Sequence, residues 1–443
     1  MRPAILRKAC DIFVFCLFLF SCQATHNSNT TSQAGIPKNS SRAIPYYPLE
    51  KDDDLDVLIR EIGDAKIVLL GESTHGTHEY YTWRTAITKK LIEEKGFDFI
   101  AIEGDWDDSY KINQFIAGPA QDSAAIVTVL RQYDRWPSSM WSNYEMVPLL
   151  QWLNDYNQHR SKKIGFYGLD LYSFWEWTQQ QTEGNDTAIQ NAIRRVRDFF
   201  AIYNNDAMIY ADSLRHLSPD GSFVAQHLWN QVQKFTGKRQ PKDEAGFFLN
   251  QHALLTLNGE RYFHTLIKDH VKAINLRDAY MAETSKRLTN FYGPHSRAVI
   301  WVHNGHAGNS RYSSTSESGY MNMTEILKNE FGHHKIFSVG FGTYRGTVMA
   351  GYTWGGHIQK QSVLPAKGAS WEYLLHEISP ENKIVLSKDI QSNSSLNKWI
   401  EFRSIGAAYE GAAIYNRSII PKRFDAFIFV DSTTALHPIE NMK

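Results

Sequence analysis

The stretch KIVLLGESTH (residues 66–75) joins a short apolar, β-branched run directly to a carboxylate and an imidazole. A run of this kind predicts a buried strand, and the catalytic groups of α/β domains gather where such strands end. A second stretch of the same form, AVIWVHNGH, occupies residues 298–306. We therefore expect one pocket at the edge of a sheet to contain Glu72, His75, His303 and His306, and these side chains indicate a hydrolytic site.

Further apolar runs predict more strands, at residues 97–102, 163–167, 335–339 and 426–430. Segments with a helical period lie between the strands, notably at residues 79–95 and 147–160. Such alternation predicts an α/β fold in which helices flank a mostly parallel central sheet in three layers.

Between residues 170 and 297 the sequence pattern changes from alternating strands and helices to helices alone. Long amphipathic helices are expected there instead of strands, at residues 187–203, 222–236, 244–267 and 275–290. We expect an α/β catalytic domain formed by residues 46–175 and 291–443. Residues 176–290 would form an inserted helical subdomain that roofs the active-site cleft.

The N-terminus has the form of an export signal. Basic residues precede an apolar run at residues 12–20 that is too short for a membrane span, which predicts a signal peptide over residues 1–21. The run ends in LFSC, which resembles a lipobox, so we expect Cys22 to be lipidated; a plain signal peptide is the alternative. Residues 22–45 are rich in Ser, Asn and Thr and predict a flexible tether. These features together predict that the protein is exported and is anchored to a membrane as a lipoprotein, on the periplasmic or outer-membrane side of a bacterial envelope.

Cysteine content and charge exclude several classes of function. The three cysteines are Cys10, Cys16 and Cys22, and all belong to the signal or its end. The body therefore has no internal disulfide, no cysteine-based metal site and no catalytic thiol. When the three basic residues and one acidic residue of the signal are set aside, the 47 basic and 47 acidic residues become 44 and 46. Nothing in this balance favours a nucleic-acid partner.

The spacing Glu72-x-x-His75 places a carboxylate and an imidazole within one turn. The carboxylate would orient the ring and raise its basicity, so that His75 takes a proton from water. The alternative is that backbone groups satisfy both side chains, and the same choice applies to His303-x-x-His306.

Glu103 also follows an apolar run, at residues 100–102. A carboxylate buried at this position needs a positive partner. Arg84, on the helix after His75, is one candidate, and Arg277, on a later helix, is the other.

Two familiar hydrolase templates do not fit the sequence. The first loop has His75 where a G-x-S-x-G nucleophile elbow needs its second glycine, and no H-E-x-x-H zinc helix occurs. Water activated by histidine is therefore the leading mechanism. A metal-dependent hydrolase is the alternative, with Glu72, His75, Glu103 and His303 as ligands.

Tryptophans follow the strand predicted at residues 97–102 and recur in the irregular stretch 135–145. Such side chains suit the lining of a substrate pocket, and packing is the alternative. The candidate substrate-binding residues are Trp106, Trp136, Trp141, Arg277 and Asn304.

Several motifs together resemble the erythromycin esterase family. They occur in order over about residues 46–438, and they are Gly71–Gly76, Arg84, Ile102–Asp105, the Trp-rich stretch 135–145, Arg277–Asp278 with Met281–Glu283, and Val302–His306. Agreement of several blocks at once is more specific than any single motif.

The resemblance implies a carboxylic-ester hydrolase that opens the lactone of macrolide antibiotics such as erythromycin and confers resistance to them. It also implies that no cofactor, covalent intermediate or metal is required. The roles that it implies are a general base, His75, a supporting network of Glu72, Glu103 and Arg84, and a pair that positions water or stabilises the oxyanion, His303 and His306. The expected partners are a small ester substrate and, through the lipid anchor, a membrane.

Two further functions stay open beside the metal-dependent hydrolase. One is an esterase of the same fold that acts on a cell-envelope ester, because a fold alone does not fix a substrate. The other is a surface lipoprotein that binds a glycan or a polyketide without turning it over.

Overall fold

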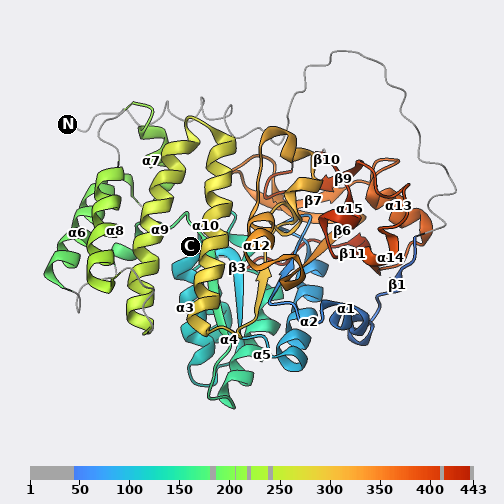
Figure 1. Cartoon of the computed structure of the whole chain (residues 1–443), viewed down its shortest axis with the longest axis horizontal. Coiled ribbons are helices and arrows are strands. Elements are labelled where there is room, and N and C mark those ends of the chain that lie inside the picture. The colour runs from blue at the N-terminus through green and yellow to red at the C-terminus, as the bar shows by residue number, and fades with distance from the viewer. Residues whose placement is uncertain are drawn as a thin grey trace.

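A computed structural model describes residues 44–179, 186–204, 206–216, 221–237, 243–409 and 414–439. Helices flank a central sheet of nine strands, which confirms the expected α/β fold (Figure 1). The predicted signal peptide, Cys22 and nearly all of the predicted tether lie outside the described residues. The described body begins with Ile44, whose side chain is already buried. No helix in these described ranges is long and apolar enough to cross a membrane.

The strands of the central sheet follow the order β1-β8-β11-β6-β2-β5-β3-β4, and β7 pairs with β6. Their bounds are β1 Tyr47–Pro48, β2 Ile67–Leu70, β3 Phe99–Asp105, β4 Gly165–Asp170, β5 Ala298–Trp301, β6 Ile336–Gly351, β7 Ile358–Val363, β8 Lys383–Leu386 and β11 Ala426–Thr433. A separate pair consists of β9 (Ile400–Ser404) and β10 (Ile414–Ser418).

The strands expected from the sequence are the parallel ones, β4, β3, β5, β2, β6 and β11. Parallel strands are covered on both faces, so they are continuous apolar runs in the sequence. The strands that were not expected, β1, β7 and β8, are antiparallel to their neighbours. Four of the six residues of β7, IQKQSV, are polar, and two of its six positions are buried, so it does not form a continuous apolar run.

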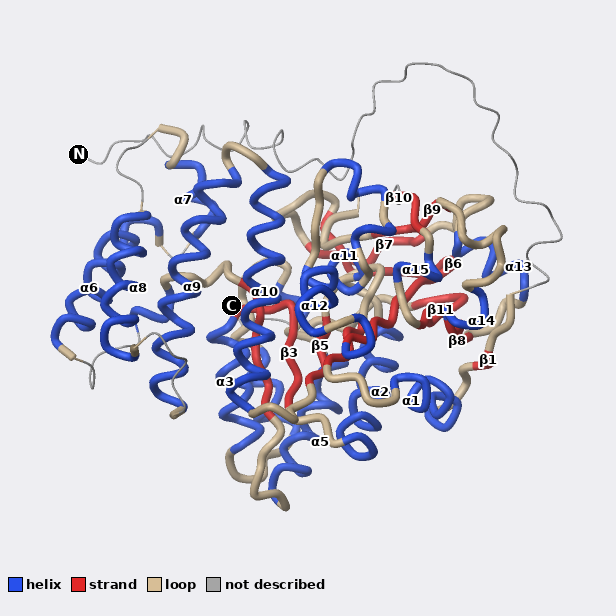
Figure 2. The backbone as a smooth tube through the Cα atoms, in the orientation of Figure 1, coloured by secondary structure: helices blue, strands red, loops and turns tan. Residues whose placement is uncertain are grey.

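Helices cover both faces of the sheet (Figure 2). Those near the sheet are α1 Asp56–Ile62, α2 His78–Lys95, α3 Trp106–Ala117, α4 Ser123–Leu130, α5 Val147–Gln158, α11 Asn304–Ala307, α12 Met323–Phe331, α13 Trp371–Ile378, α14 Ser387–Ile390 and α15 Ile420–Arg423. Between β4 and β5 the described residues form α6 Thr187–Phe200, α7 Ala207–Ser213, α8 Ser222–Thr236, α9 Glu244–Leu266 and α10 His270–Tyr292. The α6, α8 and α9 helices stack at one end of the molecule in Figure 1.

The α10 helix links this stack to the sheet, because it contacts α9 on one side and β4 and α12 on the other. It starts earlier than the sequence predicts, at His270, because the side chain of Asp269 accepts a hydrogen bond from the backbone N–H of Lys272 and caps it. The position of α10 brings a helical residue, Arg277, to the edge of the sheet.

The core lies on both faces of the sheet, as β2 illustrates. Its side chains alternate between two hydrophobic clusters, with Ile67 and Leu69 in one and Val68 and Leu70 in the other. All are fully buried. Burial of each such side chain contributes about 1.5–3 kcal/mol. The apolar run of this stretch therefore fixes β2 in the middle of the sheet.

Gly71 lies where β2 gives way to the loop that carries Glu72 and His75. A Cβ at Gly71 would lie 2.2 Å from Asn304 Oδ1 and 2.9 Å from the carbonyl oxygen of Val339. Asn304 is itself fixed, since its Nδ2 donates to the carbonyl of Phe341 at 2.6 Å and its Oδ1 accepts from the N–H of Phe341 at 3.2 Å. The two loops can approach each other because residue 71 has no side chain.

We expect the substitution Gly71→Ala to destabilise the protein by about 1–3 kcal/mol, because an added methyl group must push Asn304 away from β6. Urea unfolding followed by circular dichroism measures this loss. Gly368→Ala is the matched control, since a Cβ at residue 368 would have no neighbour within 4 Å. Equal stabilities of the two variants would contradict the close approach.

Candidate active site

The loop after β2 contains a paired acid and base. His75 Nδ1 lies 2.7 Å from Glu72 Oε1. Because a carboxylate can only accept a hydrogen bond, the proton of the neutral ring is on Nδ1 and the lone pair is on Nε2. The side chain of His75 keeps 15% of its surface exposed while that of Glu72 is fully buried. This arrangement orients a base toward solvent-accessible space.

Arg84 neutralises the buried carboxylate of Glu72. Its Nη2 lies 2.7 Å from Glu72 Oε2, and both side chains are fully buried. The guanidinium lies between the rings of Tyr81 and Trp301, 4.4 and 4.6 Å from their centroids. Aromatic faces stabilise a cation in this position. The position of Glu72 is thus fixed by charge and by packing.

Glu103, in β3, connects the two loops to α10. Its Oε2 accepts a hydrogen bond from the backbone N–H of His303 at 2.8 Å, and its Oε1 accepts one from Arg277 Nη2 at 2.8 Å. Burial alone would raise the pKa of Glu103, but the charges of His306 and Arg277 outweigh it and hold this pKa well below its usual range. Of the two candidate partners, Arg277 therefore pairs with Glu103.

Arg277 also forms a two-point ion pair with Asp170 at the end of β4. The distances are 2.9 Å from Nε to Oδ1 and 2.6 Å from Nη2 to Oδ2. Both side chains are buried. Such bidentate pairs fix direction as well as charge. The guanidinium of Arg277 is held by the carboxylates of Glu103 and Asp170. In this arrangement it stabilises the site and is not free to bind a ligand.

His306 is a buried cation. Its Nδ1 lies 2.7 Å from Asp278 Oδ1, and its Nε2 lies 3.3 Å from Glu103 Oε1. Burial would lower the pKa of His306, but the charges of Asp278 and Glu103 raise it to about 10. Arg277 Nη1 lies 3.1 Å from the same Nε2, and the surrounding carboxylates make the proximity of two cations tolerable.

His303 is a neutral ring beside these charges. Its Nδ1 accepts a hydrogen bond from the backbone N–H of Gly305 at 3.1 Å, so the proton is on Nε2. That buried Nε2 makes no hydrogen bond of good geometry within the described part of the chain, although the backbone of Ser73 is close enough to the ring to favour its protonated form. Burial and the neighbouring His75 lower the pKa of His303 to about 3. The rings of His303 and His75 lie 5.1 Å apart, so an N–H donor stands next to the base.

Several expected substrate contacts lie in the interior instead. Trp106 is fully buried against Tyr167 and Phe248, so it belongs to the hydrophobic core. Trp141 donates from Nε1 to the carbonyl of Glu103 at 2.9 Å and is also buried. The burial of both side chains favours packing, which is the alternative to substrate binding for these tryptophans.

Asn304 and Trp136 have different surroundings. Asn304 is buried, and its side chain bonds the backbone of Phe341, so it connects the start of α11 to β6. Trp136 is half-buried, and its ring lies 4.6 Å from that of Trp354, which is 46% exposed. Of the expected tryptophans, Trp136 is the one that retains surface for a ligand.

Asp170 and Asp278 are site residues that the sequence reasoning did not assign. Each carboxylate contacts a cation of the cluster, Arg277 or His306. The sequence did hold a signal for both residues, since Asp170 lies just after a predicted strand and Asp278 is next to Arg277 in the chain. Only the packing of α10 against the sheet shows which cations they meet.

In the metal-dependent alternative, the carboxylates of Glu72 and Glu103 would bind the ion. Each of them is already paired with an arginine. Glu72 faces Arg84 and Glu103 faces Arg277. Over the described ranges, the group of histidine and carboxylate atoms close enough to share an ion is a different one, His78, Glu145 and His437. The geometry therefore favours an arrangement of acid, base and donors at the ends of β2 and β5.

The lowered pKa of the buried ring of His303 predicts how stability depends on pH. The unfolded chain protonates His303 below about pH 6.5, whereas the folded chain resists protonation to about pH 3. Between about pH 6.5 and pH 3, His303 therefore lowers the free energy of unfolding by about 1.4 kcal/mol for each pH unit that the pH falls.

Replacing His303 with Asn should remove this contribution, so the wild type should lose stability relative to the variant between pH 7 and pH 5. Urea unfolding at both pH values measures the difference. His334→Asn, at an exposed position, serves as the control. Parallel stability profiles of the wild type and the His303 variant would contradict a buried neutral imidazole.

Comparison with known proteins places this geometry in a family. A sequence model of the family described as erythromycin esterase matches residues 92–433. The match includes Glu103, Arg277, His303 and His306, and it starts after the loop of Glu72 and His75. An erythromycin esterase type II of Escherichia coli is 21% identical over 435 residues, which cover 88% of this chain and 96% of that protein.

Solved structures share the fold. A succinoglycan biosynthesis protein is 20% identical with a TM-score of 0.70 and covers 93% of this chain and 100% of its own. A Bacillus cereus protein is 18% identical with a TM-score of 0.70, over 89% of this chain and 97% of its own. An erythromycin esterase variant in its open conformation is 14% identical with a TM-score of 0.62, over 88% of this chain and 98% of its own. With the family match spanning most of its length, the chain belongs to the erythromycin esterase family.

Proposed function

We propose that this protein hydrolyses the lactone ester of macrolide antibiotics and so confers resistance to them. Family membership supports an ester hydrolase. The observation that carries the proposal is the pair of rings at the sheet edge, whose centroids lie 5.1 Å apart and whose Nδ1 atoms are engaged by Glu72 in His75 and by the N–H of Gly305 in His303. A base and an oxyanion donor at this separation are what attack of water on an ester requires.

The reaction begins when His75 Nε2 takes a proton from water and the water oxygen bonds to the ester carbon. The developing imidazolium is stabilised through its Nδ1–H by Glu72, at 2.7 Å, and Glu72 is held in turn by Arg84. Collapse of the tetrahedral intermediate breaks the bond to the ring oxygen, and His75 returns its proton to that oxygen. The product is an open-chain hydroxy acid. A positioned base of this kind accelerates hydrolysis by about 10²–10⁴-fold.

Negative charge forms on the carbonyl oxygen during this step. His303 Nε2–H is suited to receive it, because it is a donor whose one competing acceptor, the backbone of Ser73, is not held in a hydrogen bond of good geometry. His306 adds a positive charge behind it, since its pKa is raised to about 10 by its carboxylate partners. A single oxyanion donor contributes about 10²–10³-fold to kcat.

An ester on a cell-envelope carbohydrate is the second candidate substrate. It requires the same base and the same donor, so the chemistry at the sheet edge does not separate the two. One solved structure of this fold is named as a succinoglycan biosynthesis protein. The macrolide is preferred because the erythromycin esterase relative matches nearly the whole of both chains.

We also propose that the protein is exported and attached to a membrane through lipidated Cys22. The support is in the sequence, in which LFSC follows an apolar run and a polar segment follows the cysteine. On this view the helices between β4 and β5 belong to a lobe that roofs the cleft, with Arg277 as its contact to the site.

Mass spectrometry of macrolides of different ring size, incubated with the protein, tests the substrate. We expect addition of one water to at least one of them. No product from any macrolide, together with release of acid from acylated envelope carbohydrate, would favour the second candidate. If neither class of ester is hydrolysed while binding persists, a binding protein is the better assignment.

His75→Ala should lower kcat by at least about 10²-fold, because no other group replaces the base. Its circular dichroism spectrum and Tm should stay close to those of the wild type, since Arg84 still neutralises the buried carboxylate of Glu72 when the ring is removed. His334→Ala is the matched control at an exposed histidine. Retained hydrolysis in the folded His75 variant would refute the mechanism.

Labelling with an alkyne analogue of palmitate in a bacterial host tests the anchor. The wild type should take up the label, and Cys22→Ala should not. Cys16→Ala should keep the label, because residue 16 lies inside the signal that is removed. A labelled Cys22 variant would show that this cysteine is not the lipidated residue.

A further inference from the structure

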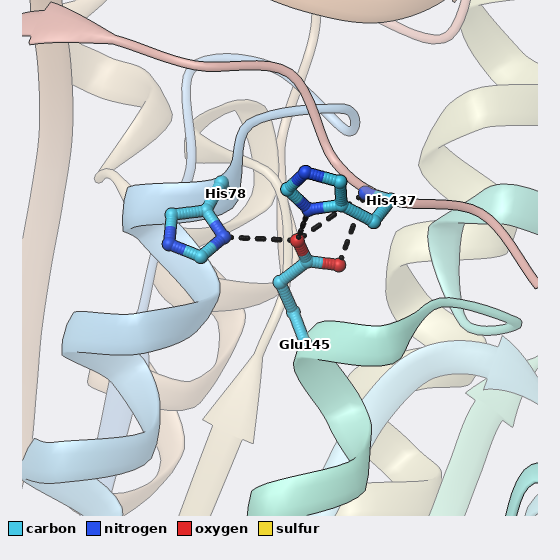
Figure 3. A group of neighbouring side chains, drawn as sticks. All are labelled: His78, Glu145 and His437. Atoms are coloured by element: carbon cyan, nitrogen blue, oxygen red, sulfur yellow. Dashed lines mark hydrogen bonds and ion pairs between the residues drawn. The ribbon is translucent and has the colours of Figure 1, made fainter.

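A second cluster of histidine and carboxylate lies away from the proposed catalytic base. His78 begins α2, Glu145 belongs to the short 3₁₀ helix Tyr144–Met146, and His437 follows β11. Figure 3 shows both rings directed at the one carboxylate. Nδ1 of His78 lies 2.9 Å and Nδ1 of His437 lies 2.6 Å from Glu145 Oε1.

The donor set matches a transition metal. Two imidazole nitrogens and one carboxylate oxygen are ligands that Zn²⁺ prefers, and here they lie within 4.8 Å of one another. With metal–ligand distances of about 2.0–2.2 Å, tetrahedral ligands lie about 3.3 Å apart, so each Nδ1 needs to move away from Glu145 Oε1 only slightly. The side chains of His78 and His437 are 38% and 68% exposed, which leaves them room to move. Exposure on that side also leaves a coordination position for water.

The surroundings fix the ligand atoms. Glu145 is almost fully buried, and the backbone N–H of His437 lies 3.2 Å from both of its oxygens. The hydroxyl of Thr82 donates to the carbonyl of His78 at 3.3 Å, and its oxygen lies 3.4 Å from His78 Nε2. That oxygen can accept a hydrogen bond from Nε2–H, which leaves Nδ1 as the metal-binding nitrogen. Partners of this kind orient metal-binding histidines in proteins.

A plain hydrogen-bonded trio is the simpler account of the same contacts. It requires a proton on both Nδ1 atoms, because Oε1 can only accept. A metal ion would replace these two protons and bind to the same three atoms. The buried charge of Glu145 favours the ion, because its ion-pair partners in the described chain are the two histidines, with no Lys or Arg among them.

We propose that His78, Glu145 and His437 bind one Zn²⁺ ion that fastens the segment 434–439 to the start of α2. This segment is already attached there, since the N–H of His78 donates to the carbonyl of Thr434 at 2.9 Å and that of Leu436 donates to Gly76 at 3.0 Å. Gly76 adjoins His75, so the ion holds the loop of the proposed base without touching the reacting atoms. The site is structural, and it uses none of the residues assigned to hydrolysis.

Equilibrium dialysis of the purified full chain against zinc chloride, after removal of metals with EDTA, tests the site. Mass spectrometry of the metal content should give one Zn²⁺ per wild-type chain. His437→Ala should weaken binding by at least about tenfold, and Glu145→Gln should do the same. His333→Ala, in an exposed pair of histidines, should bind like the wild type.

Thermal unfolding supplies a second readout. Zinc chloride should raise the Tm of the wild type and leave that of the His437 variant unchanged, because a ligand stabilises only the state that binds it. His437 is the better variant, since its side chain is exposed and its loss leaves the fold intact. Stoichiometric binding that survives in His437→Ala, or no binding by the wild type, would overturn the proposal. Neither result depends on ester hydrolysis.

Discussion

The carboxylate of Glu103 is the group on which the arrangement of the site depends. It is buried in β3, and it is satisfied by the backbone N–H of His303 and by Arg277 on α10. A buried charge that loses one partner costs about 3–5 kcal/mol, so the strand, the loop after β5 and the helix must meet for the fold to be stable. The requirement that stabilises the sheet edge is therefore the same one that assembles the catalytic groups.

Three histidines in this small volume acquire different properties because their Nδ1 atoms have different partners. Glu72 accepts a proton from His75 Nδ1, which leaves a basic Nε2. The N–H of Gly305 donates to His303 Nδ1, which leaves an Nε2–H and a neutral ring. Asp278 faces His306 Nδ1, and with Glu103 it makes that ring a cation. One residue type thus supplies three different states of the imidazole ring, namely a basic nitrogen, an N–H donor and a positive charge.

Sequence patterns predicted the parallel core of the fold and the pairing of Glu72 with His75, because both are local in the chain. They did not predict β7 or β8, which are short or partly polar and are defined by the neighbour they pair with. The choice between Arg84 and Arg277 for Glu103 depended on the packing of α10. Trp106 and Trp141 could not be assigned from sequence, since a tryptophan in the core and one in a pocket look alike until burial is known.

The loop of His75 is held by parts of the chain that are synthesised much later. The carbonyl of Gly76 accepts hydrogen bonds from Met349, at 2.9 Å, and from Leu436, at 3.0 Å. A growing chain on the ribosome therefore carries the sequence of the loop long before it has the means to position it. The same holds for any chain that crosses a membrane unfolded. The loop of His75 is therefore positioned only once the whole domain has folded.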